Sequence, residues 1–402
     1  MVRALHVFPW DAAAEGCGAA IGAVAELRCD TVLLSVNYHR ARLFRPRQPA
    51  LGYYARPLDW LDFHPDPTLY PAGFPLPAVN PDRAVVEAVS QCREHCRRHG
   101  LAFHASVIGC HNTTLGLARP DLTVRTAFDD RYAFALCPAH PEVRAYLLGL
   151  VRDVARNLAP DALLLDSFSF LDAVHREHHE LMFVPPGPVG EHLLGLCFCE
   201  HCHAWAARRG VDAEAVRQTT RRLVETLLLR DAHGSQAGYD EAELAAVHHE
   251  EPLLAAFQQV RREIVHSLLT ELRAAAQETG CALDINSGLL ARPSARAWTE
   301  GAPLQTRAEI ARHVYVQAHF PRLEQSRQDL AWAATVLPPE RLVLATMMSH
   351  GNIGTEPELR ARVEMAAALG AAGVSIYNYG LLTAKRLGWI RSAFAALERN
   401  TW

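Results

Sequence analysis

Short hydrophobic runs recur along the whole chain. Most are nearly continuous stretches of Val, Leu, Ile and Ala rather than strict alternations with polar residues, which is typical of parallel β-strands covered on both faces. The eight runs lie at residues 3–10, 31–39, 101–110, 162–170, 281–290, 313–320, 341–351 and 373–382.

Helical patterns separate these runs. We expect helices over 12–28, 82–99, 141–157, 255–279, 323–336, 356–370 and 384–398. "NPDRAVVEAV" and "HPEVRAYLLGLV" both place Pro close to a helix start, with acidic residues in the first turn. A strand–helix unit repeated eight times predicts an α/β fold, a (β/α)8 TIM barrel forming one domain over 1–402. An open doubly wound sheet is the alternative, but no G-x-G-x-x-G follows the first run.

Two connections are longer than a barrel needs. Residues 40–81 follow the second strand and are rich in Pro, Tyr and Trp, and residues 171–254 follow the fourth strand. The second insertion contains a Cys/His cluster and helical patterns near 203–209 and 213–230. Both begin at the carboxyl end of a strand, where barrel enzymes build their active sites, so we expect them to elaborate that face.

Composition narrows the class of protein. Of 402 residues, 50% are hydrophobic and 21% charged, and the formal net charge of −4 indicates no preference for nucleic acid or anionic membranes. No apolar run is long enough for a transmembrane helix, and "MVRALHVFPW" fits a strand better than a signal peptide. Ten cysteines without an export signal favour reduced thiols and a cytoplasmic location. A homo-oligomer is compatible with this composition.

Three cysteines are concentrated in "CFCEHC". Cys197, Cys199 and Cys202 form C-x-C-x-x-C, and thiolates at this spacing can converge on one structural zinc ion. The fourth ligand would come from elsewhere, and the candidates are Cys110, Cys137, His201 and His203. The alternative is a group of small buried residues at a helix start. A redox role is disfavoured because a thioredoxin-type C-x-x-C needs a different strand–helix setting.

The same segment carries a resemblance to a known family. "CFCEHC", in the long connection after the fourth strand, is similar to the C-x-C-x-x-C of the zinc-binding β-galactosidases of glycoside hydrolase family 42. "FALCPAHPEVRAYLLGLVRDV" (134–154) resembles the entry to the third barrel helix in many such enzymes, and "CHNTTLG" (110–116) and "FSFLDAVHREHHE" (168–180) look like loops of related barrels. The resemblance covers roughly 100–210 and the final "YNYG", and it implies a TIM barrel that acts on carbohydrate.

The chain departs from that family at its catalytic positions. Those β-galactosidases carry a Glu after Asn at the end of the fourth strand and another Glu at the seventh. Here the corresponding strands end "LLLDSFSF" and "ATMMSHG", with no Glu at either tip. Neither the catalytic pair nor β-galactosidase activity can therefore be carried over.

Other carboxylates remain as candidates, because glycosidic cleavage needs one carboxyl group as proton donor and one as nucleophile or base. Asp166 closes the apolar run "ALLLD", and Asp284 lies in "ALDINSG" on the next strand. If both face inward, we expect them to pair across adjacent strands. Glu177 and Glu180, in "HREHHE", are alternative acids. The competing interpretations are structural. Asp166 would bond neighbouring loop amides, Asp284 would be a buried residue that organises the barrel mouth, and the two Glu residues would lie on a solvated charged loop.

Histidines, amides and aromatic residues gather near the same strand ends. Such side chains supply the mixed donors and acceptors that a hydroxyl-rich ligand needs, although each is individually more often a packed residue. The predicted substrate-binding set is Asn37, His39, His104, His111, Asn112, His179, Asn286, His319, His350, Asn378 and Tyr379. Trp10, Tyr38, Tyr53, Tyr54, Trp60 and Tyr379 are candidate flat faces for sugar rings, with ordinary loop packing as the alternative.

Three functions therefore stay open. The first is a glycoside hydrolase acting on a small carbohydrate or glycoside. The second is a metal-dependent isomerase, epimerase or lyase, in which His104, His111, His319 or His350 joins Asp166 or Asp284 around a divalent ion. The third is a non-catalytic sugar-binding barrel that has lost one carboxylate. Two carboxylates in one metal-free pocket would favour the first.

Overall fold

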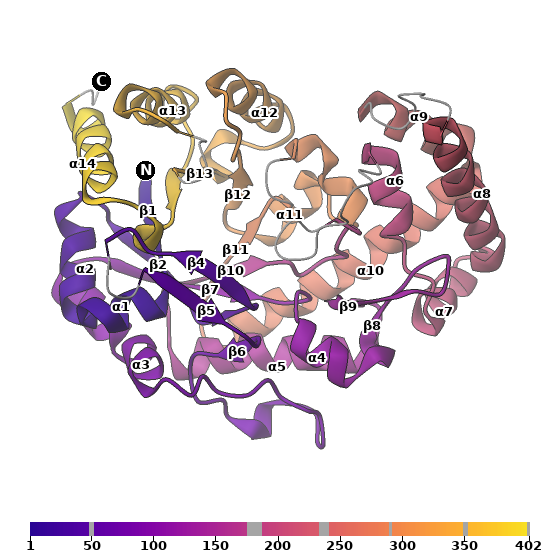
Figure 1. Ribbon diagram of the computed structural model, residues 1–402, viewed down its shortest axis with the longest axis horizontal. Coiled ribbons are helices and arrows are strands. Elements are labelled where there is room, and N and C mark those ends of the chain that lie inside the picture. The colour runs from indigo at the N-terminus through magenta and orange to yellow at the C-terminus, as the bar shows by residue number, and fades with distance from the viewer. Residues whose placement is uncertain (48–51, 175–186, 233–240, 289–291, 349–352, 400–402) are drawn as a thin grey trace.

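The computed structural model describes the chain except residues 48–51, 175–186, 233–240, 289–291, 349–352 and 400–402 (Figure 1). Its centre is a closed barrel of eight parallel strands in the order β1-β14-β13-β12-β11-β10-β7-β2. The predicted (β/α)8 TIM barrel is thereby confirmed. The barrel strands are β1 Val2–Val7, β2 Thr31–Ser35, β7 Ala102–Ile108, β10 Ala162–Asp166, β11 Ala282–Asn286, β12 Val314–Gln317, β13 Leu342–Met347 and β14 Gly373–Tyr377.

Each barrel strand overlaps one of the eight hydrophobic runs but ends before it does. The apolar residues beyond a strand end belong to loops that pack over the barrel mouth; Phe168 and Phe170, which follow β10, are both buried. A continuous apolar run therefore marks a buried strand together with its buried loop, and periodicity alone does not separate the two.

Helices form the outer layer around the barrel. They are α1 Pro9–Glu15, α2 Cys17–Glu26, α3 Arg83–Arg98, α5 Pro141–Asn157, α10 Pro252–Gln277, α11 Leu304–Ile310, α12 Leu323–Val336, α13 Glu356–Ala368 and α14 Ala384–Arg399. The helix expected over 12–28 is split at Gly16, whose φ of +83° interrupts the helix. The short α11, between β11 and β12, was not predicted.

Among the described residues, the buried apolar side chains form three clusters, one of which includes Phe8, Trp10 and Tyr38. Inside the barrel, Leu33, Leu164, Tyr315 and Val343 fill the space between the strands. A larger cluster lies between the strands and the surrounding helices. Among the helices that the structure describes, none combines the length and apolar character that a membrane span requires.

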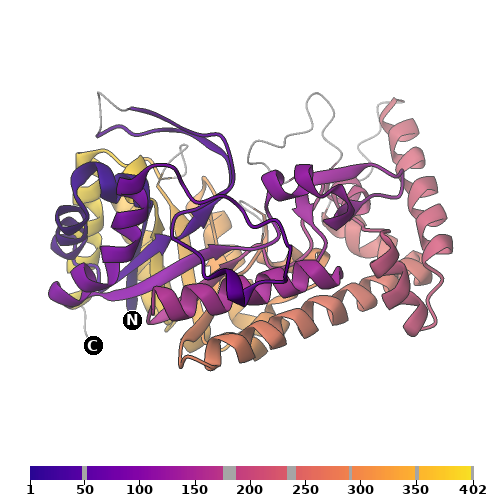
Figure 2. The ribbon, with the colours of Figure 1, turned by 90° about the horizontal axis from the view of Figure 1, so that it is seen from below.

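Four connections elaborate the carboxyl-terminal side of the barrel. After β2 come β3 Asn37–Tyr38, β4 Ala41–Phe44, β5 Tyr53–Arg56, β6 Trp60–Leu61 and the 3-10 helix η2 Pro67–Leu69. After β7 come α4 Thr113–Ala118, η3 Pro120–Leu122, β8 Thr123–Arg125 and β9 Arg131–Leu136. After β10 come α6 Gly187–Leu194, α7 Glu200–Arg208, α8 Ala213–Ala232 and α9 Glu241–Glu250, and β11 is followed by η4 Ser294–Glu300. Figure 2 shows the β4–β5 hairpin over one part of the barrel and α6–α9 projecting at the other end.

Candidate active site

A polar cavity of about 90 Å³ opens at the carboxyl-terminal end of the barrel. This volume is several times what one ordered water needs. Side chains from all eight barrel strands or the segments that directly follow them line it, including Asp166, Asn286, His319 and Tyr377. Its position is where barrel enzymes place their chemistry.

Of the residues that the structure describes, two carry carboxyl groups that reach this cavity. Asp166 is the last residue of β10, and its side chain accepts a hydrogen bond from the Ser167 hydroxyl at 3.1 Å. Glu300 ends η4, in the connection that follows the neighbouring strand β11. The two acids therefore come from adjacent strand-to-helix connections and line one space.

Glu300 is almost completely buried, and its two oxygens have different surroundings. Arg307 donates to Oε2 at 2.7 Å, and the Ser169 hydroxyl donates to the same oxygen at 3.2 Å. Within the described part of the chain, no hydrogen bond reaches Oε1. Burial raises the pKa of Glu300, and the positive charge of Arg307 only partly opposes that rise. This environment favours a protonated carboxyl group with one open oxygen.

Gly288 makes room for this carboxyl group. Its φ is +133°, a conformation that L side chains rarely adopt, and a Cβ built on it would lie 3.1 Å from Glu300 Oε1. Gly288 also lines the cavity. A larger residue at this position would crowd the open oxygen.

Four histidines line the cavity as well: His6, His39, His111 and His319. His39 and His111 stack with ring centroids 4.4 Å apart. Burial, with a smaller contribution from His319, lowers the pKa of His6 to about 3, so that ring is neutral near pH 7. A neutral imidazole offers one donor and one acceptor, which suits hydroxyl groups.

Asp284 is placed differently from the sequence-based prediction. It faces the barrel interior, but it pairs in register with Leu164, two residues before Asp166 on β10. That difference is about 7 Å along the strand. Arg312 donates to both carboxylate oxygens, at 3.1 and 2.7 Å, and the His313 amide donates at 3.1 Å. Burial opposes the charge, but these partners outweigh it and hold the pKa of Asp284 below its usual value.

The expected pairing of Asp284 with Asp166 is therefore corrected. Arg312 and His313 directly precede β12, so the Asp284 carboxylate is held toward the amino-terminal end of the barrel. His104, predicted to bind substrate, lies with it: its Nδ1 is 4.0 Å from an Asp284 oxygen. Both residues stabilise the barrel interior, below the cavity.

Several predicted binding residues form hydrogen bonds within the protein instead. Asn37 bonds both the amide and the carbonyl of Ile108, and Asn112 caps α4 by accepting from the Leu115 amide. Asn378 accepts from the Gly380 amide. The Tyr379 hydroxyl donates to Glu15 at 2.5 Å. These four residues position loops, and the prediction that they touch substrate is not supported by their contacts.

Of the predicted set, the structure brings together Asp166, His39, His111, Asn286 and His319. Glu177, Glu180, His179 and His350 lie outside the described residues. Glu300, Arg307, Gln317 and His6 also line the cavity and were not predicted from the sequence. The local sequence offers one signal for Glu300, because in "RAWTEG" this acidic residue directly precedes a glycine. In the structure that glycine has a φ of +85°.

The aromatic residues are mostly packed. Phe8, Trp10 and Tyr54 form a stack, with centroids 4.3 and 4.7 Å apart. The Tyr38 and Tyr377 hydroxyls lie 2.8 Å from each other at the cavity wall. Tyr53, by contrast, is 68% exposed.

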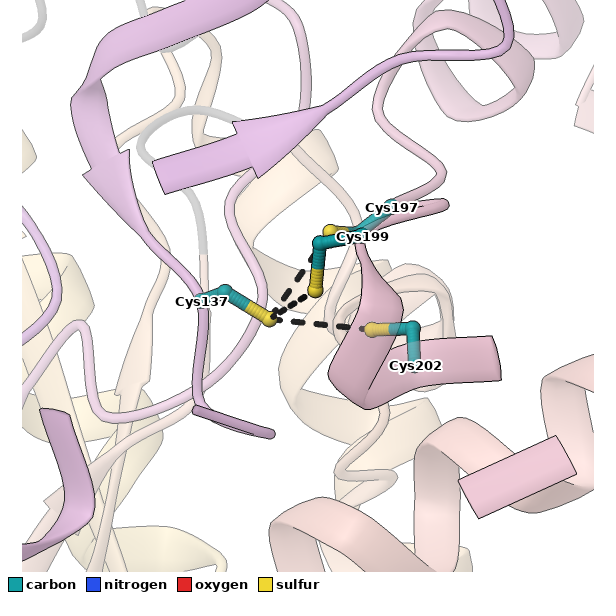
Figure 3. Close-up of side chains that lie close together, drawn as sticks. All are labelled: Cys137, Cys197, Cys199 and Cys202. Atoms are coloured by element: carbon teal, nitrogen blue, oxygen red, sulfur yellow. Dashed lines mark hydrogen bonds between the residues drawn. The ribbon is translucent and has the colours of Figure 1, made fainter. Parts of the chain in front are cut away.

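The cysteines of "CFCEHC" meet a fourth cysteine. Cys137, directly after β9, lies with its Sγ 3.6 Å from those of Cys199 and Cys202 and 3.7 Å from that of Cys197 (Figure 3). All four are buried. Of the candidates for a fourth ligand, Cys137 is therefore the one that converges, whereas His201 packs on His140 and His203 on Phe198.

This geometry fits a tetrahedral metal. A Zn–S bond of about 2.3 Å places sulfur atoms about 3.8 Å apart, close to the observed separations. The Arg125 amide lies 3.4 Å from the Cys197 sulfur, as expected for an outer hydrogen bond to a metal-bound thiolate. The buried cluster could thus hold a metal such as zinc.

The cluster connects to the cavity through the backbone. The Leu136 amide, next to Cys137, bonds the Cys110 carbonyl, and the Cys110 amide bonds the carbonyl of Ser167. Ser167 follows Asp166. The four cysteines therefore link the connection after β7 to the connection after β10. The hydrogen bond to Ser167 lies next to Asp166, so this link supports the position of its carboxylate.

Comparison with known proteins supports the fold. No protein-family model matches the sequence, and no curated protein matches it either. Among solved structures, the catalytic domain of β-amylase from Paenibacillus polymyxa matches with a TM-score of 0.58 and 12% identity over 98% of both chains. The β-galactosidase from the psychrophilic Marinomonas ef1 matches with a TM-score of 0.55 and 11% identity, covering 99% of this chain and 60% of that one.

The α-L-fucosidase isoenzyme 2 from Paenibacillus thiaminolyticus matches with a TM-score of 0.53 and 12% identity. The alignment covers 99% of this chain but only 49% of the fucosidase, so the chain spans about half the length of that enzyme. The protein thus has distant structural similarity to glycoside hydrolase TIM-barrel domains. At these identities the similarity concerns the fold alone.

Proposed function

We propose that this protein is a carbohydrate-active enzyme that hydrolyses a glycosidic bond with Asp166 and Glu300. The observation that carries the proposal is the presence of two carboxyl groups, from adjacent strand-to-helix connections, in one polar cavity at the carboxyl-terminal end of the barrel. Hydrolysis of a glycoside requires such a pair. The distant similarity to glycoside hydrolase barrels agrees with this assignment.

Glu300 is the proposed proton donor. Burial raises its pKa above the ordinary value for Glu, which is the direction that a general acid requires. Arg307 and Ser169 occupy Oε2, which leaves Oε1 to carry the proton toward the leaving oxygen of the substrate. Gly288, without a side chain, gives the substrate access to that oxygen.

Asp166 is the proposed nucleophile or base. It stands at the tip of β10 with its carboxylate at the cavity wall, where it can meet the sugar carbon or an attacking water. The histidines and Asn286 would hold the hydroxyl groups of the ring. Asp166 keeps the role that the sequence suggested, and Glu300 takes the role first considered for Asp284.

The two rival functions have less support. Among the described residues, the groups of three or more metal-binding side chains are the cysteine cluster and Asp121, His140 and Glu142. Neither group lines the cavity, so a metal-dependent reaction there has no preformed ligand set in this part of the chain. A binding protein without catalysis would not need a second carboxyl group with a raised pKa in the cavity.

The cysteine cluster is proposed to bind structural zinc through Cys137, Cys197, Cys199 and Cys202. A bound ion would supply folding energy and would fix the connections that carry Asp166. The resemblance to the family 42 enzymes also implies zinc here. Metal analysis of purified protein, with about one zinc per chain expected, tests the assignment.

A panel of 4-nitrophenyl glycosides tests the catalytic proposal. Wild-type protein should release nitrophenol from at least one of them, and Asp166→Asn and Glu300→Gln should each lower kcat by about 10²–10⁴-fold. Glu324→Gln, on a side chain that is 65% exposed on α12, serves as the matched control. Near-normal turnover in both cavity variants would rule out the assignment.

A further inference from the structure

The hairpin formed by β4 and β5 has two different faces. Its strands pair antiparallel, with Phe44 opposite Tyr53 and Arg42 opposite Ala55. Directly opposite residues project to the same side, so these four side chains share one face. Ala41, Arg45 and Arg56, which alternate with them, are buried. The hairpin therefore presents one inner face to the barrel and one outer face to solvent.

The inner face is firmly attached. Arg56 forms a fully buried ion pair with Asp62 at 2.8 Å and also donates to the Tyr38 carbonyl. Tyr54 stacks on Trp10 with a centroid distance of 4.7 Å and an interplanar angle of 17°. The outer face is consequently held in a fixed orientation over the barrel, as Figure 2 shows for the hairpin as a whole.

The outer face has an unusual composition for a solvated surface. Phe44 is 72% exposed and Tyr53 68% exposed, although the outward positions of an antiparallel pair are normally polar. A groove of about 590 Å³ runs along this face, and its lining includes Arg40, Arg42 and Tyr53. Neither arginine forms an ion pair with any residue that the structure describes. Two exposed rings and two unneutralised guanidinium groups thus stand together.

This face continues the wall of the candidate active site. Tyr38 and His39 line the cavity, and Arg40, the next residue, lines the groove. The cavity and the groove are therefore lined by consecutive residues of one segment, residues 38–42.

We propose that the outer face of the β4–β5 hairpin binds the part of a carbohydrate chain that extends beyond the ring held in the cavity. The inference rests on the proposed function. Aromatic faces pack against the C–H faces of sugar rings, and guanidinium groups donate several hydrogen bonds to hydroxyl or carboxylate oxygens. A protein partner is disfavoured by area, because two aromatic side chains offer well under the roughly 800 Å² per partner of a standard interface.

The double variant Phe44→Ala/Tyr53→Ala tests the proposal, with Leu228→Ala, 54% exposed on α8, as the matched control. Wild-type protein is applied to an array of immobilised oligosaccharides and the corresponding monosaccharides. At least one oligosaccharide should bind more tightly than its monosaccharide. The double variant should bind that chain at least tenfold more weakly, while the control binds it as wild type does.

Equal binding by wild type and the double variant would overturn the proposal, as would failure of every oligosaccharide to bind better than its monosaccharide. So would a wild-type dimer that the double variant dissociates in sedimentation, because the face would then be a protein interface. Thermal unfolding checks that the double variant is folded. Binding on the array needs no turnover, so this result is independent of whether Asp166 and Glu300 are catalytic.

Discussion

Arg307 offers the sharpest test of the proposed role of Glu300. Its guanidinium group is buried and donates to Glu300 Oε2 at 2.7 Å, to the Ala302 carbonyl at 2.8 Å and to the Asn286 carbonyl at 2.5 Å. Arg307→Gln removes the positive charge but retains an amide that can donate to one of these oxygens. Arg307→Lys retains the charge and loses the forked geometry.

The size of the effect follows from the charges. Two unit charges about 4 Å apart attract by about 4 kcal/mol at an effective dielectric constant of about 20. Each 1.4 kcal/mol or so corresponds to one pH unit in the titration of a group. Relaxation around the new side chain reduces the effect, so we expect the titration of Glu300 to move upward by about 1–3 units in Arg307→Gln.

The assay is the pH dependence of kcat/KM for the best aryl glycoside. If Glu300 donates the proton, activity falls as the pH rises through its pKa, and this alkaline limb should move to higher pH in Arg307→Gln. Arg307→Lys should move it much less. An alkaline limb that stays in place in folded Arg307→Gln protein would refute the reasoning. Movement of the acidic limb instead would show that Glu300 acts as the ionised group.

Three further predictions concern stability and the shape of the site. Cys199→Ser should lower the melting temperature and reduce the zinc content from about one ion per chain to none. Cys29→Ser, outside the cluster, should retain the zinc. Equal zinc content in the two variants would contradict the assignment of the cluster. Burial raises the pKa of Asp11 from 3.8 to about 7, against the pull of Arg45, so the folded chain holds a proton that the unfolded chain releases between these values. The contribution of Asp11 to the free energy of unfolding is therefore present at low pH and is lost, by up to about 4 kcal/mol, as the pH rises toward 7. Asp11→Asn should reduce the dependence of the free energy of unfolding on pH in this range. An unchanged dependence would contradict the prediction. Gly288→Ala should lower kcat at least tenfold, because a strained backbone and a Cβ at 3.1 Å from Glu300 Oε1 disturb the carboxyl group; full activity would show that Oε1 is not used.

The architecture was predictable because it depends on repetition. Eight apolar runs separated by helical patterns are enough to specify a closed parallel barrel, since each strand is buried on both sides and each connection returns to the same end. The short helix α11 was not predicted, because its seven residues show too little hydrophobic periodicity to be distinguished from a loop. The hairpin of β8 and β9 was not predicted because β8 has only three residues, too few to show an alternation.

Among the predicted site residues that the structure describes, those that line the cavity lie at or just after the ends of barrel strands. Asp166 was found because a charge that ends an apolar run needs a partner or a function. Asp284 faces inward as its alternation indicates, but alternation gives the face of a strand and not the height at which the side chain stands. Glu300 lies in η4, outside the barrel strands, so the periodicity of the strands gives no indication that it lines the cavity.

The cysteine cluster, too, was predictable only for the residues that lie close together in the sequence. The spacing of Cys197, Cys199 and Cys202 can be read directly, because it is local. Cys137 comes from the connection after a different strand, and its convergence depends on how two loops pack over the barrel mouth. Four candidates for the fourth ligand were therefore equivalent until their positions in space were known.

The most direct test of the central claim is a crystal structure of Glu300→Gln protein with a glycoside that the wild type hydrolyses. We expect the scissile sugar ring in the barrel cavity, with the Asp166 carboxylate near its anomeric carbon. The amide of residue 300 should lie within about 3.2 Å of the glycosidic oxygen. A ring bound away from Asp166, or a glycosidic oxygen that residue 300 does not reach, would contradict the proposed mechanism.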